Sequence, residues 1–233
     1  RERESERAPL STLELARLWM LPFVRCLSKQ YCEALKRAPV RVKALTSGAA
    51  FGTTDALAQV RESAAPSDAD DHQQQQQQHH DATRMLVAAS YGALYQAPLN
   101  HIAWNVLERR FPGTSWAAVM SRVAVDQLTL MPVNMVFFLS WRPVSTALLS
   151  ALDEARSLDD VRRIFMDGLA AAEANVRAAW APACTCALSI WPWVHPLNFR
   201  YVPLERRRLV TNVCSVFIFS FATWVRDEKD DPD

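Results

Sequence analysis

The chain has 233 residues, of which half are apolar, and its formal net charge is +1. This length accommodates one or at most two domains. The near-neutral charge gives no reason to expect a nucleic acid partner, which would call for a strong basic patch. The mean hydropathy of −0.08 is typical of a soluble protein, but this average hides a very uneven distribution of charged residues along the chain.

Long stretches without Asp, Glu, Lys or Arg separate the charged parts of the chain. They cover residues 85–107, 127–141, 178–199 and 209–225. A helix needs about 20 mainly apolar residues to span a bilayer, so these stretches predict membrane-spanning helices. A soluble bundle of buried helices is the alternative, because a short apolar run by itself does not separate the two.

The N-terminal part of the chain is predicted to be peripheral. Residues 1–30 form a mobile arm that is rich in Arg but also contains acidic residues, unlike most transit peptides. Residues 24–37 have apolar residues on one side and basic residues placed to meet lipid headgroups, which predicts a short amphipathic helix. Pro39 is expected to open the next helix.

The first predicted span covers residues 40–60 and carries a stripe of small residues. The small residues recur every four positions, at Ala44, Gly48, Gly52 and Ala56. This spacing lets helix backbones approach closely in lipid. Asp55 and Gln59 fall in the same stripe, about 20° to either side of Gly48. We therefore expect both polar groups to point into a bundle, as an intramembrane carboxylate must.

Residues 61–83 are predicted to form a disordered loop, because they contain the glutamine run 73–78 framed by His72, His79 and His80. Such a tract can bind a metal, but no acidic or Cys ligand stands at a structured spacing from it, so we expect no metal site. The five Cys of the chain are scattered and odd in number, which argues against a disulfide framework and favours small apolar packing residues.

The second predicted span covers residues 84–107, and Pro98 is expected to kink it. Gly92, Gln96 and Asn100 are four residues apart and therefore share one face of this helix. His101 lies near the end of the span, where a hydrogen-bonded interfacial His is favoured over a pH sensor.

The third predicted span covers residues 119–149. Gln127 and Asn134 are seven residues apart and share a face. Asp126 stands beside them, and it either lines a polar cavity or pairs with Arg122, four residues before it on the same helix.

The C-terminal part is predicted to contain one interrupted segment and one span. Residues 178–199 are apolar but contain three Pro, which predicts a Pro-broken interfacial or re-entrant segment. A span over residues 205–225 and an acidic tail over residues 226–233 follow. The three successive arginines Arg206, Arg207 and Arg208 are expected to contact phospholipid headgroups; a site for an anionic metabolite is the alternative.

The predicted fold is therefore all-α: a multi-pass membrane helical bundle over residues 31–225, with about four spanning helices, an amphipathic N-terminal helix and a Pro-broken interfacial segment. Four spans place both termini on one side of the membrane, and five place them on opposite sides. The expected partners are the lipid bilayer and, through the small-residue stripe, a second copy of the chain or a membrane complex.

Three blocks of residues resemble a known family. The first contains Tyr31, Ala34-Leu35, Pro39, Val42, Leu45-Thr46, Gly48, Gly52, Asp55 and Gln59. The second contains Arg84, Tyr91-Gly92, Pro98, His101, Trp104, Leu107-Glu108-Arg109, Phe111-Pro112-Gly113-Thr114, Asp126-Gln127 and Pro132. The third contains Trp191-Pro192, Asn198-Phe199, Val202-Pro203 and Arg207. In order and spacing, over residues 31–225, they resemble the Mpv-seventeen / twenty-two-kilodalton peroxisomal membrane protein family.

The chain departs from this family's pattern in a few places. The pair Ala103-Trp104 stands where the family usually has Trp-Tyr, His195 stands where it usually has Gln, and Ile218 stands where it commonly has Trp. The glutamine-rich insert is not a family feature. These changes affect the transfer of residue roles more than the fold.

The resemblance implies about four membrane helices in an organelle membrane. The mitochondrial inner membrane is favoured, and the peroxisomal and plastid membranes are the alternatives. It also implies a role as a channel or as a factor in metabolite and reactive-oxygen homeostasis, and it brings no reaction and no cofactor.

Two functional hypotheses follow. In the first, the protein is a channel or passive pore for small solutes; the polar lining candidates are Asp55, Gln59, Asp126, Gln127, Asn134 and His101. In the second, it is a non-conducting scaffold that binds a partner through the small-residue stripe. A membrane enzyme is not expected, because the sequence contains no nucleophile elbow, phosphate-binding loop, metalloprotease motif or dinucleotide fingerprint.

Overall fold

The computed structural model describes residues 29–64 and 82–230, with side chains described for residues 29–62 and 82–218. The predicted N-terminal arm up to residue 28, most of the predicted loop over 61–83 with its Gln and His residues, and the last three residues of the tail lie outside the described residues. Residues up to Val42 and residues from Lys43 onward form two compact units, and each is described by itself.

The described part of the first unit is helical. Residues 29–37 form a helix, as the amphipathic pattern predicts, and Leu35 is buried. A new helix, α2 (Pro39–Ala64), begins at Pro39 and continues into the second unit. A helix tolerates Pro at this position because its first backbone N–H groups have no intrahelical acceptor.

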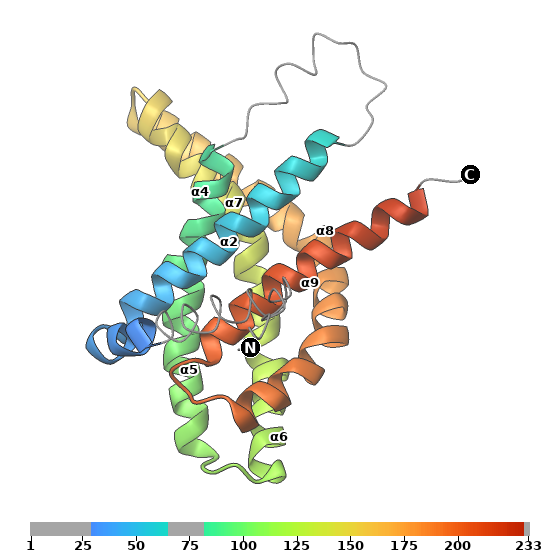
Figure 1. The fold of residues 1–233 in the computed structure, drawn as a ribbon. Coiled ribbons are helices and arrows are strands. Elements are labelled where there is room, and N and C mark those ends of the chain that lie inside the picture. Colours follow the sequence, from blue (N-terminus) through green and yellow to red (C-terminus); the bar gives the residue numbers. More distant parts are fainter. Residues whose placement is uncertain (1–28, 65–81, 231–233) are drawn as a thin grey trace, which may run out of the picture. The chain divides into compact units, whose positions relative to one another are not determined.

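The described elements of the second unit are all helical and form five rods (Figure 1). The rods are α2; then α4 (Ala82–Ser90), η1 (Tyr91–Gln96) and α5 (Ala97–Arg110); then α6 (Trp116–Val125), η2 (Asp126–Leu130) and α7 (Met131–Glu154); then α8 (Leu158–Tyr201); and finally α9 (Arg207–Asp230). This confirms the all-α class for the part of the chain that the structure describes.

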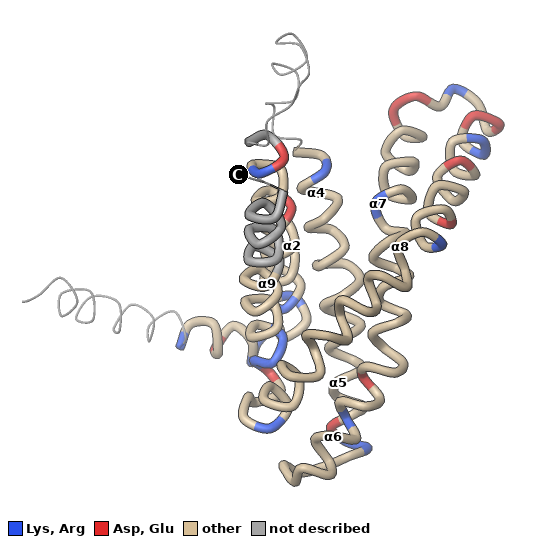
Figure 2. The backbone as a smooth tube through the Cα atoms, turned by 90° about the vertical axis from the view of Figure 1, so that its right-hand side faces the viewer, with Lys and Arg blue, Asp and Glu red and all other residues tan. Residues whose placement is uncertain are grey.

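Successive rods of the second unit run in opposite directions. The connections at residues 111–115 and 202–206 therefore lie at one end of the bundle, which we call the loop end (Figures 1 and 2). The turn at residues 155–157 between α7 and α8 lies at the other end, which we call the hairpin end. Charged residues gather towards these ends, and long uncharged stretches lie between them (Figure 2).

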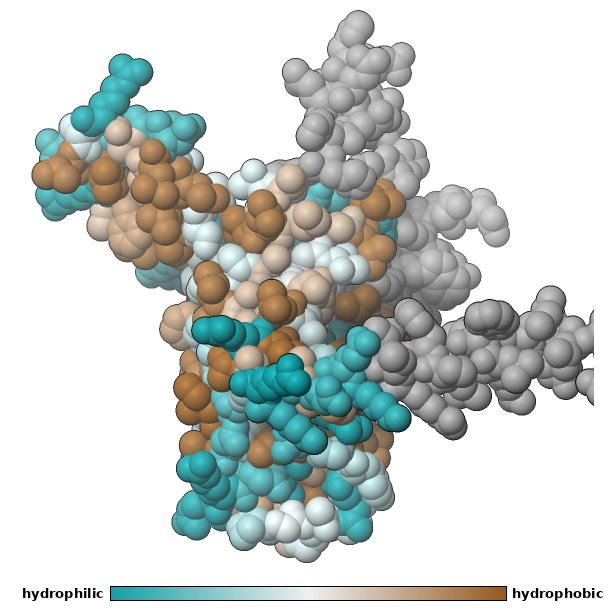
Figure 3. Space-filling model, turned by 60° about the vertical axis from the view of Figure 1, so that its left-hand side comes forward, coloured by the Kyte–Doolittle hydropathy of each residue, from teal (hydrophilic) through white to brown (hydrophobic). Residues whose placement is uncertain are grey.

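Several polar side chains lie inside this unit, and many large apolar side chains lie at its surface. Ser47, Asn198 and Arg208 are at most 4% exposed. Leu45, Leu94 and Leu128, by contrast, are more than 70% exposed, and brown, hydrophobic residues reach the surface at many places along the bundle (Figure 3). A water-soluble domain buries its large apolar residues and exposes its charges. The opposite arrangement is that of a bundle surrounded by lipid.

One described rod, Trp116–Glu154, is by itself long and apolar enough to cross a membrane. The predicted spans over 40–60, 84–107 and 205–225 form helices in the expected places, but within the described residues they do not reach this level of apolarity. In the second rod, for example, Gln96, Asn100 and His101 lower the mean hydropathy. The structure therefore confirms helices at these positions. That four of them span the membrane stays a prediction.

The predicted Pro-broken segment over 178–199 is wrong. These residues continue the helix that begins at Leu158, so α8 is a single helix with Pro182, Pro192 and Pro196 inside it. Each Pro removes only one backbone hydrogen bond and bends the helix, and packing against a neighbouring helix tolerates such a loss. The rod follows a bent path instead of breaking (Figure 1).

The length of α8 exceeds what a membrane requires. Its 44 residues correspond to about 66 Å at the rise of an α-helix, roughly twice the hydrocarbon thickness of a bilayer. The charged half over 158–177 pairs with the end of α7 at the hairpin end. Gly168 lets the two backbones approach, since a Cβ there would collide with that of Ala147. The apolar half over 178–199 remains alongside the other rods.

Two Pro residues shape the second and third rods in the same way. Each follows a π-helical turn by one residue: Pro98 follows η1 and Ala97, and Pro132 follows η2 and Met131. The N–H of Ala97 bonds to the carbonyl of Gly92, and that of Met131 to the carbonyl of Asp126. These bonds reach back five residues, so the helix widens just before a residue that has no N–H to donate. Such π-turns are frequent at functional sites.

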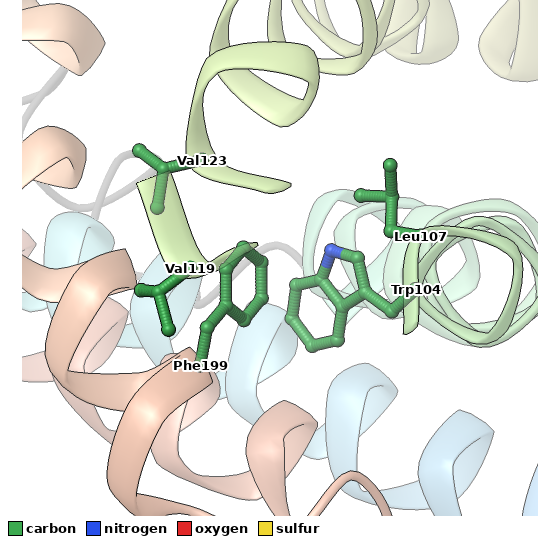
Figure 4. Close-up of a cluster of buried hydrophobic side chains, with 5 residues drawn as sticks. All are labelled: Trp104, Leu107, Val119, Val123 and Phe199. Atoms are coloured by element: carbon green, nitrogen blue, oxygen red, sulfur yellow. The ribbon is translucent and has the colours of Figure 1, made fainter. Parts of the chain in front are cut away.

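A hydrophobic cluster near the loop end fixes three of the rods (Figure 4). The ring of Phe199 lies between the side chains of α6 and those of α5. It packs edge-on against Trp104, with ring centroids 5.6 Å apart. Trp104 is therefore buried inside the bundle, 4% exposed.

Candidate functional site

A cavity of about 220 Å³ lies between the rods, and all five contribute to its wall. Its walls are mostly apolar and aromatic, including Phe51, Tyr91 and Trp191. The uncharged polar residues of the wall are Gln96, Asn100, Gln127, Asn134, Thr211 and Ser215, and the ionisable ones other than Tyr91 and Cys186 are Asp126, His195 and Arg208. Both π-turns border this space, so the widened backbone helps to open it.

Asp126 accepts two hydrogen bonds and lies near a histidine, so side chains from three rods surround it. The indole N–H of Trp104 donates to its Oδ1 at 2.9 Å, and Nε2 of Gln127 donates to its Oδ2 at 2.9 Å. His195 Nε2 lies 3.8 Å from the same Oδ2. The alternative that Asp126 pairs with Arg122 along the helix is wrong, because Arg122 turns towards the loop end.

Arg208 brings a buried positive charge to the cavity wall. Its Nε donates to Ser47 Oγ at 2.8 Å, and another guanidinium nitrogen donates to Gln96 Oε1. Asn212 Nδ2 donates to the same Ser47 hydroxyl at 3.1 Å. The bonds from α9 thus reach α2 and η1 at once, and they hold Arg208 inside the bundle.

The expected headgroup contact of the three successive arginines needs correction. Arg207 and Arg208 are buried and hydrogen-bonded to protein groups, and only Arg206 is exposed. The sequence predicts surface arginines here because basic residues before an apolar run look the same whether they contact headgroups or fold into the bundle. The metabolite-site alternative is compatible only with Arg208, the one that lines the cavity.

A charge cluster at the loop end joins Arg207 to Arg122 through Glu108. Arg207 NH1 donates to Glu108 Oε2 at 2.6 Å, and Arg122 NH1 donates to the same oxygen. Their remaining donors bond to backbone carbonyls, among them those of Phe199 and Gly113. Burial by itself would raise the pKa of Glu108, which lies just beyond the predicted span, but the two guanidinium groups outweigh it and hold this pKa below its ordinary value. One carboxylate therefore ties α5, α6 and α9 together.

Asp55 and Gln59 do not line the cavity. Asp55 accepts hydrogen bonds from Arg84 Nε at 2.9 Å and from Gln59 Nε2 at 2.7 Å. Arg84 also binds Glu62, which makes a chain of charges at the end of α2. The structure thus separates these two candidates from Asp126, Gln127 and Asn134, with which they were grouped as pore-lining residues.

His101 also lies outside the cavity wall. Its Nδ1 is 3.1 Å from Lys43 Nζ and 3.3 Å from Asn105 Nδ2. These contacts agree with the expected hydrogen bonding of His101, and its place at a membrane interface stays a prediction. The predicted pore-lining role therefore does not apply to His101 in this cavity.

The small-residue stripe of α2 packs within the chain. A Cβ on Gly48 would lie 3.1 Å from the carbonyl oxygen of Ala89, and one on Gly52 would lie 3.4 Å from the Cβ of Ala89. The close approach of backbones that Ala44, Gly48, Gly52 and Ala56 predict is therefore an approach of α2 to α4 and η1. The face expected to bind a partner is already covered around its two glycines.

The sequence contains a helical pattern for some of the cavity residues that were not predicted as site residues. Gln96 and Asn100 were placed on one face, and the structure puts both in the cavity wall. Arg208, Thr211 and Ser215 stand at helical spacing i, i+3 and i+7 and reach the same cavity. Nothing in the sequence shows that Trp104 donates to Asp126, because the two residues belong to different rods.

The chain is similar to known proteins of one family. The model of the Mpv17 / PMP22 family matches residues 165–222. Protein SYM1 of Eremothecium gossypii is 29% identical over 81% of this chain and 90% of its own length. Peroxisomal membrane protein 2 of Bos taurus is 25% identical over 92% of this chain and 96% of its own. Mitochondrial inner membrane protein Mpv17 of Caenorhabditis briggsae is 26% identical over 82% and 88%. No solved structure matches. With its helical bundle, its apolar exterior and these relatives, the chain is similar to the Mpv17 / PMP22 family of membrane proteins.

Proposed function

We propose that the protein is a passive conduit for small solutes across an organelle membrane. The observation that carries this proposal is the cavity with polar residues between five rods whose outer surface is apolar. A polar interior costs free energy inside a membrane, and it is characteristic of substrate and ion pathways. The conduit is assigned to Asp126, Gln127, Asn134 and their neighbours in the wall, and no longer to Asp55. A chemical reaction is not part of the proposal, since no catalytic motif supports one.

The proposed location is the mitochondrial inner membrane. A relative that covers 82% of this chain is named for that membrane, and another that covers 92% of it is named for the peroxisomal membrane. The peroxisome is therefore the alternative, and the plastid is a weaker one. Fluorescence microscopy of the tagged chain against markers of these organelles separates them; a signal confined to peroxisomes or plastids contradicts the mitochondrial assignment.

All five rods cross the membrane in this proposal. The apolar half of α8 is a fifth crossing in addition to the four predicted spans. It runs alongside α7 and contains no charged residue between Arg177 and Arg200. Five crossings place the two ends of the described second unit on opposite sides. With an interfacial α8, by contrast, the connection at 202–206 would stay on the side of the hairpin end.

Single-cysteine labelling distinguishes these two arrangements. Thr114→Cys, Ser157→Cys and Arg206→Cys are made separately in a background whose native cysteines are replaced by Ala, and each is exposed in the structure. We expect a membrane-impermeant maleimide to label Thr114→Cys and Arg206→Cys from one side and Ser157→Cys from the other. Labelling of Arg206→Cys from the same side as Ser157→Cys contradicts the crossing of α8.

Conduction is tested with the purified protein in planar bilayers and proteoliposomes. We expect solute flux above that of empty membranes, and a loss of most of this flux in Gln127→Leu, which removes a polar group from the wall. Asp55→Asn is the matched comparison, because Asp55 pairs with Arg84 away from the cavity. Absence of flux with insertion confirmed contradicts the conduit, and equal loss in both variants contradicts the place assigned to it.

The scaffold hypothesis loses its predicted surface. The glycines of the α2 stripe face Ala89 and Met85 of the same chain, so Gly48→Leu is expected to disturb folding rather than only assembly. Size measurement of the variant in detergent distinguishes the two: a folded monomer derived from a wild-type oligomer would restore the stripe as a partner interface.

A further inference from the structure

Three residues of the cavity wall each keep one buried polar atom without a hydrogen-bond partner. The atoms are Gln127 Oε1, Asn134 Oδ1 and His195 Nδ1. Their residues are between 6% and 8% exposed. A buried polar atom left unpaired is unfavourable, because it has lost its hydrogen bonds to water and gained none in the protein. Three such atoms around one cavity indicate that something inside it supplies the missing bonds in the functional protein.

The chemistry of these atoms indicates what the occupant offers. Gln127 donates its Nε2 to Asp126, so its remaining atom is a carbonyl oxygen and can only accept. His195 turns Nε2 towards Asp126, and a proton on that nitrogen leaves Nδ1 as an acceptor. The amide of Asn134 accepts or donates according to how it is turned. The occupant therefore brings hydrogen-bond donors, and hydroxyl groups satisfy both senses.

The charges of the wall argue against an ion. The carboxylate of Asp126 and the guanidinium of Arg208 have opposite signs, and both are already hydrogen-bonded to protein groups. Much of the rest of the wall is apolar, with side chains such as Met131 and Ile190. A free ion entering such a space loses its hydration without a net opposite charge to replace it. An uncharged molecule does not meet this cost.

We propose that the cavity takes small, uncharged solutes rich in hydroxyl groups, and passes them in preference to inorganic ions. Its volume of about 220 Å³ lies below the roughly 300–1,000 Å³ of pockets for drug-sized ligands, which suits a polyol of about three or four carbon atoms. The terminal torsions of Asn and Gln side chains are soft, so small rotations turn the unpaired atoms towards the solute. This inference rests on the proposed conduit and names its solute class.

The test measures polyol and ion transport by the same protein. Proteoliposomes containing the full chain are exposed to gradients of glycerol or erythritol, and their swelling is followed by light scattering. Potassium and chloride currents are recorded in planar bilayers. We expect polyol flux above that of empty liposomes and no ionic current. Asn134→Leu, which keeps a similar volume without polar atoms, should lower this flux about five- to tenfold, the effect of roughly one hydrogen bond.

Matched variants keep the result interpretable. Asn175→Leu makes the same change on the exposed hairpin, away from the cavity, and should leave the flux unchanged. Gln127→Met removes another acceptor from the wall and serves where Asn134→Leu fails to insert. Ionic current without polyol flux overturns the solute class but leaves a conduit. Water flux alone overturns it as well, and absence of all transport with confirmed insertion overturns both proposals. Equal loss in Asn175→Leu also contradicts the assigned site.

Discussion

Gly92→Ala should strongly destabilise the protein, because no space exists for the added methyl group. A Cβ at this position would lie 2.6 Å from the carbonyl oxygen of Ser47 and 2.8 Å from the ring of Phe51. The first contact is with backbone, which cannot rotate away. Overpacking typically costs 1–3 kcal/mol and occasionally more, and we expect at least about 3 kcal/mol here because α2 and η1 must separate.

Gly52→Ala is the matched control on the facing helix. Its Cβ would lie 3.4 Å from that of Ala89, an ordinary contact. Since Ala is favoured over Gly within a helix by about 0.5–1 kcal/mol, this variant should be neutral or slightly more stable. Thermal unfolding in mild detergent, followed by Trp fluorescence, provides the comparison. Similar unfolding midpoints for the two variants would show that α2 and η1 do not approach as the structure describes.

Glu108→Gln is expected to have the second large effect. The carboxylate neutralises Arg122 and Arg207, whose side chains are 1% and 6% exposed. Removing one partner of a buried pair costs about 3–5 kcal/mol. Because the Glu108 side chain is itself 29% exposed, we expect a smaller loss of roughly 2–3 kcal/mol.

The surface pair of Glu173 and Arg177 supplies the control. Their side chains are 61% and 78% exposed, and exposed pairs contribute at most about 1 kcal/mol. Glu173→Gln should therefore leave the unfolding midpoint nearly unchanged. If Glu108→Gln were equally harmless, the charge cluster at the loop end would not hold the three rods together.

The same cluster should make stability depend on pH. The pKa of Glu108 is held below its ordinary value in the folded chain, so the unfolded chain binds the proton first as the pH falls. The stabilisation is complete above about pH 5 and is lost as the pH falls through the folded pKa. Between pH 5 and 3 the wild type should lose more stability than Glu108→Gln, and parallel pH curves for the two proteins would contradict this cause.

The sequence by itself determined the helical class, four of the helix positions and the small-residue approach of α2. These features depend on local pattern: uncharged runs of sufficient length, Pro39 at a helix start, and Gly48 and Gly52 four residues apart. It also placed Gln96 and Asn100 on one face of a helix, because helical periodicity is a property of neighbouring residues.

Only the tertiary structure decided which polar residues share the cavity. Asp55 and Asp126 look alike in sequence, since each stands in a predicted span. Asp55 meets Arg84 from the next rod, and Asp126 meets Trp104 and lies near His195, so their surroundings differ. Likewise, Arg206 and Arg208 differ by two positions, yet one is exposed and the other is buried against Ser47. Pairing between rods and the continuity of α8 through three Pro depend on distant neighbours, and a local pattern contains no information about them.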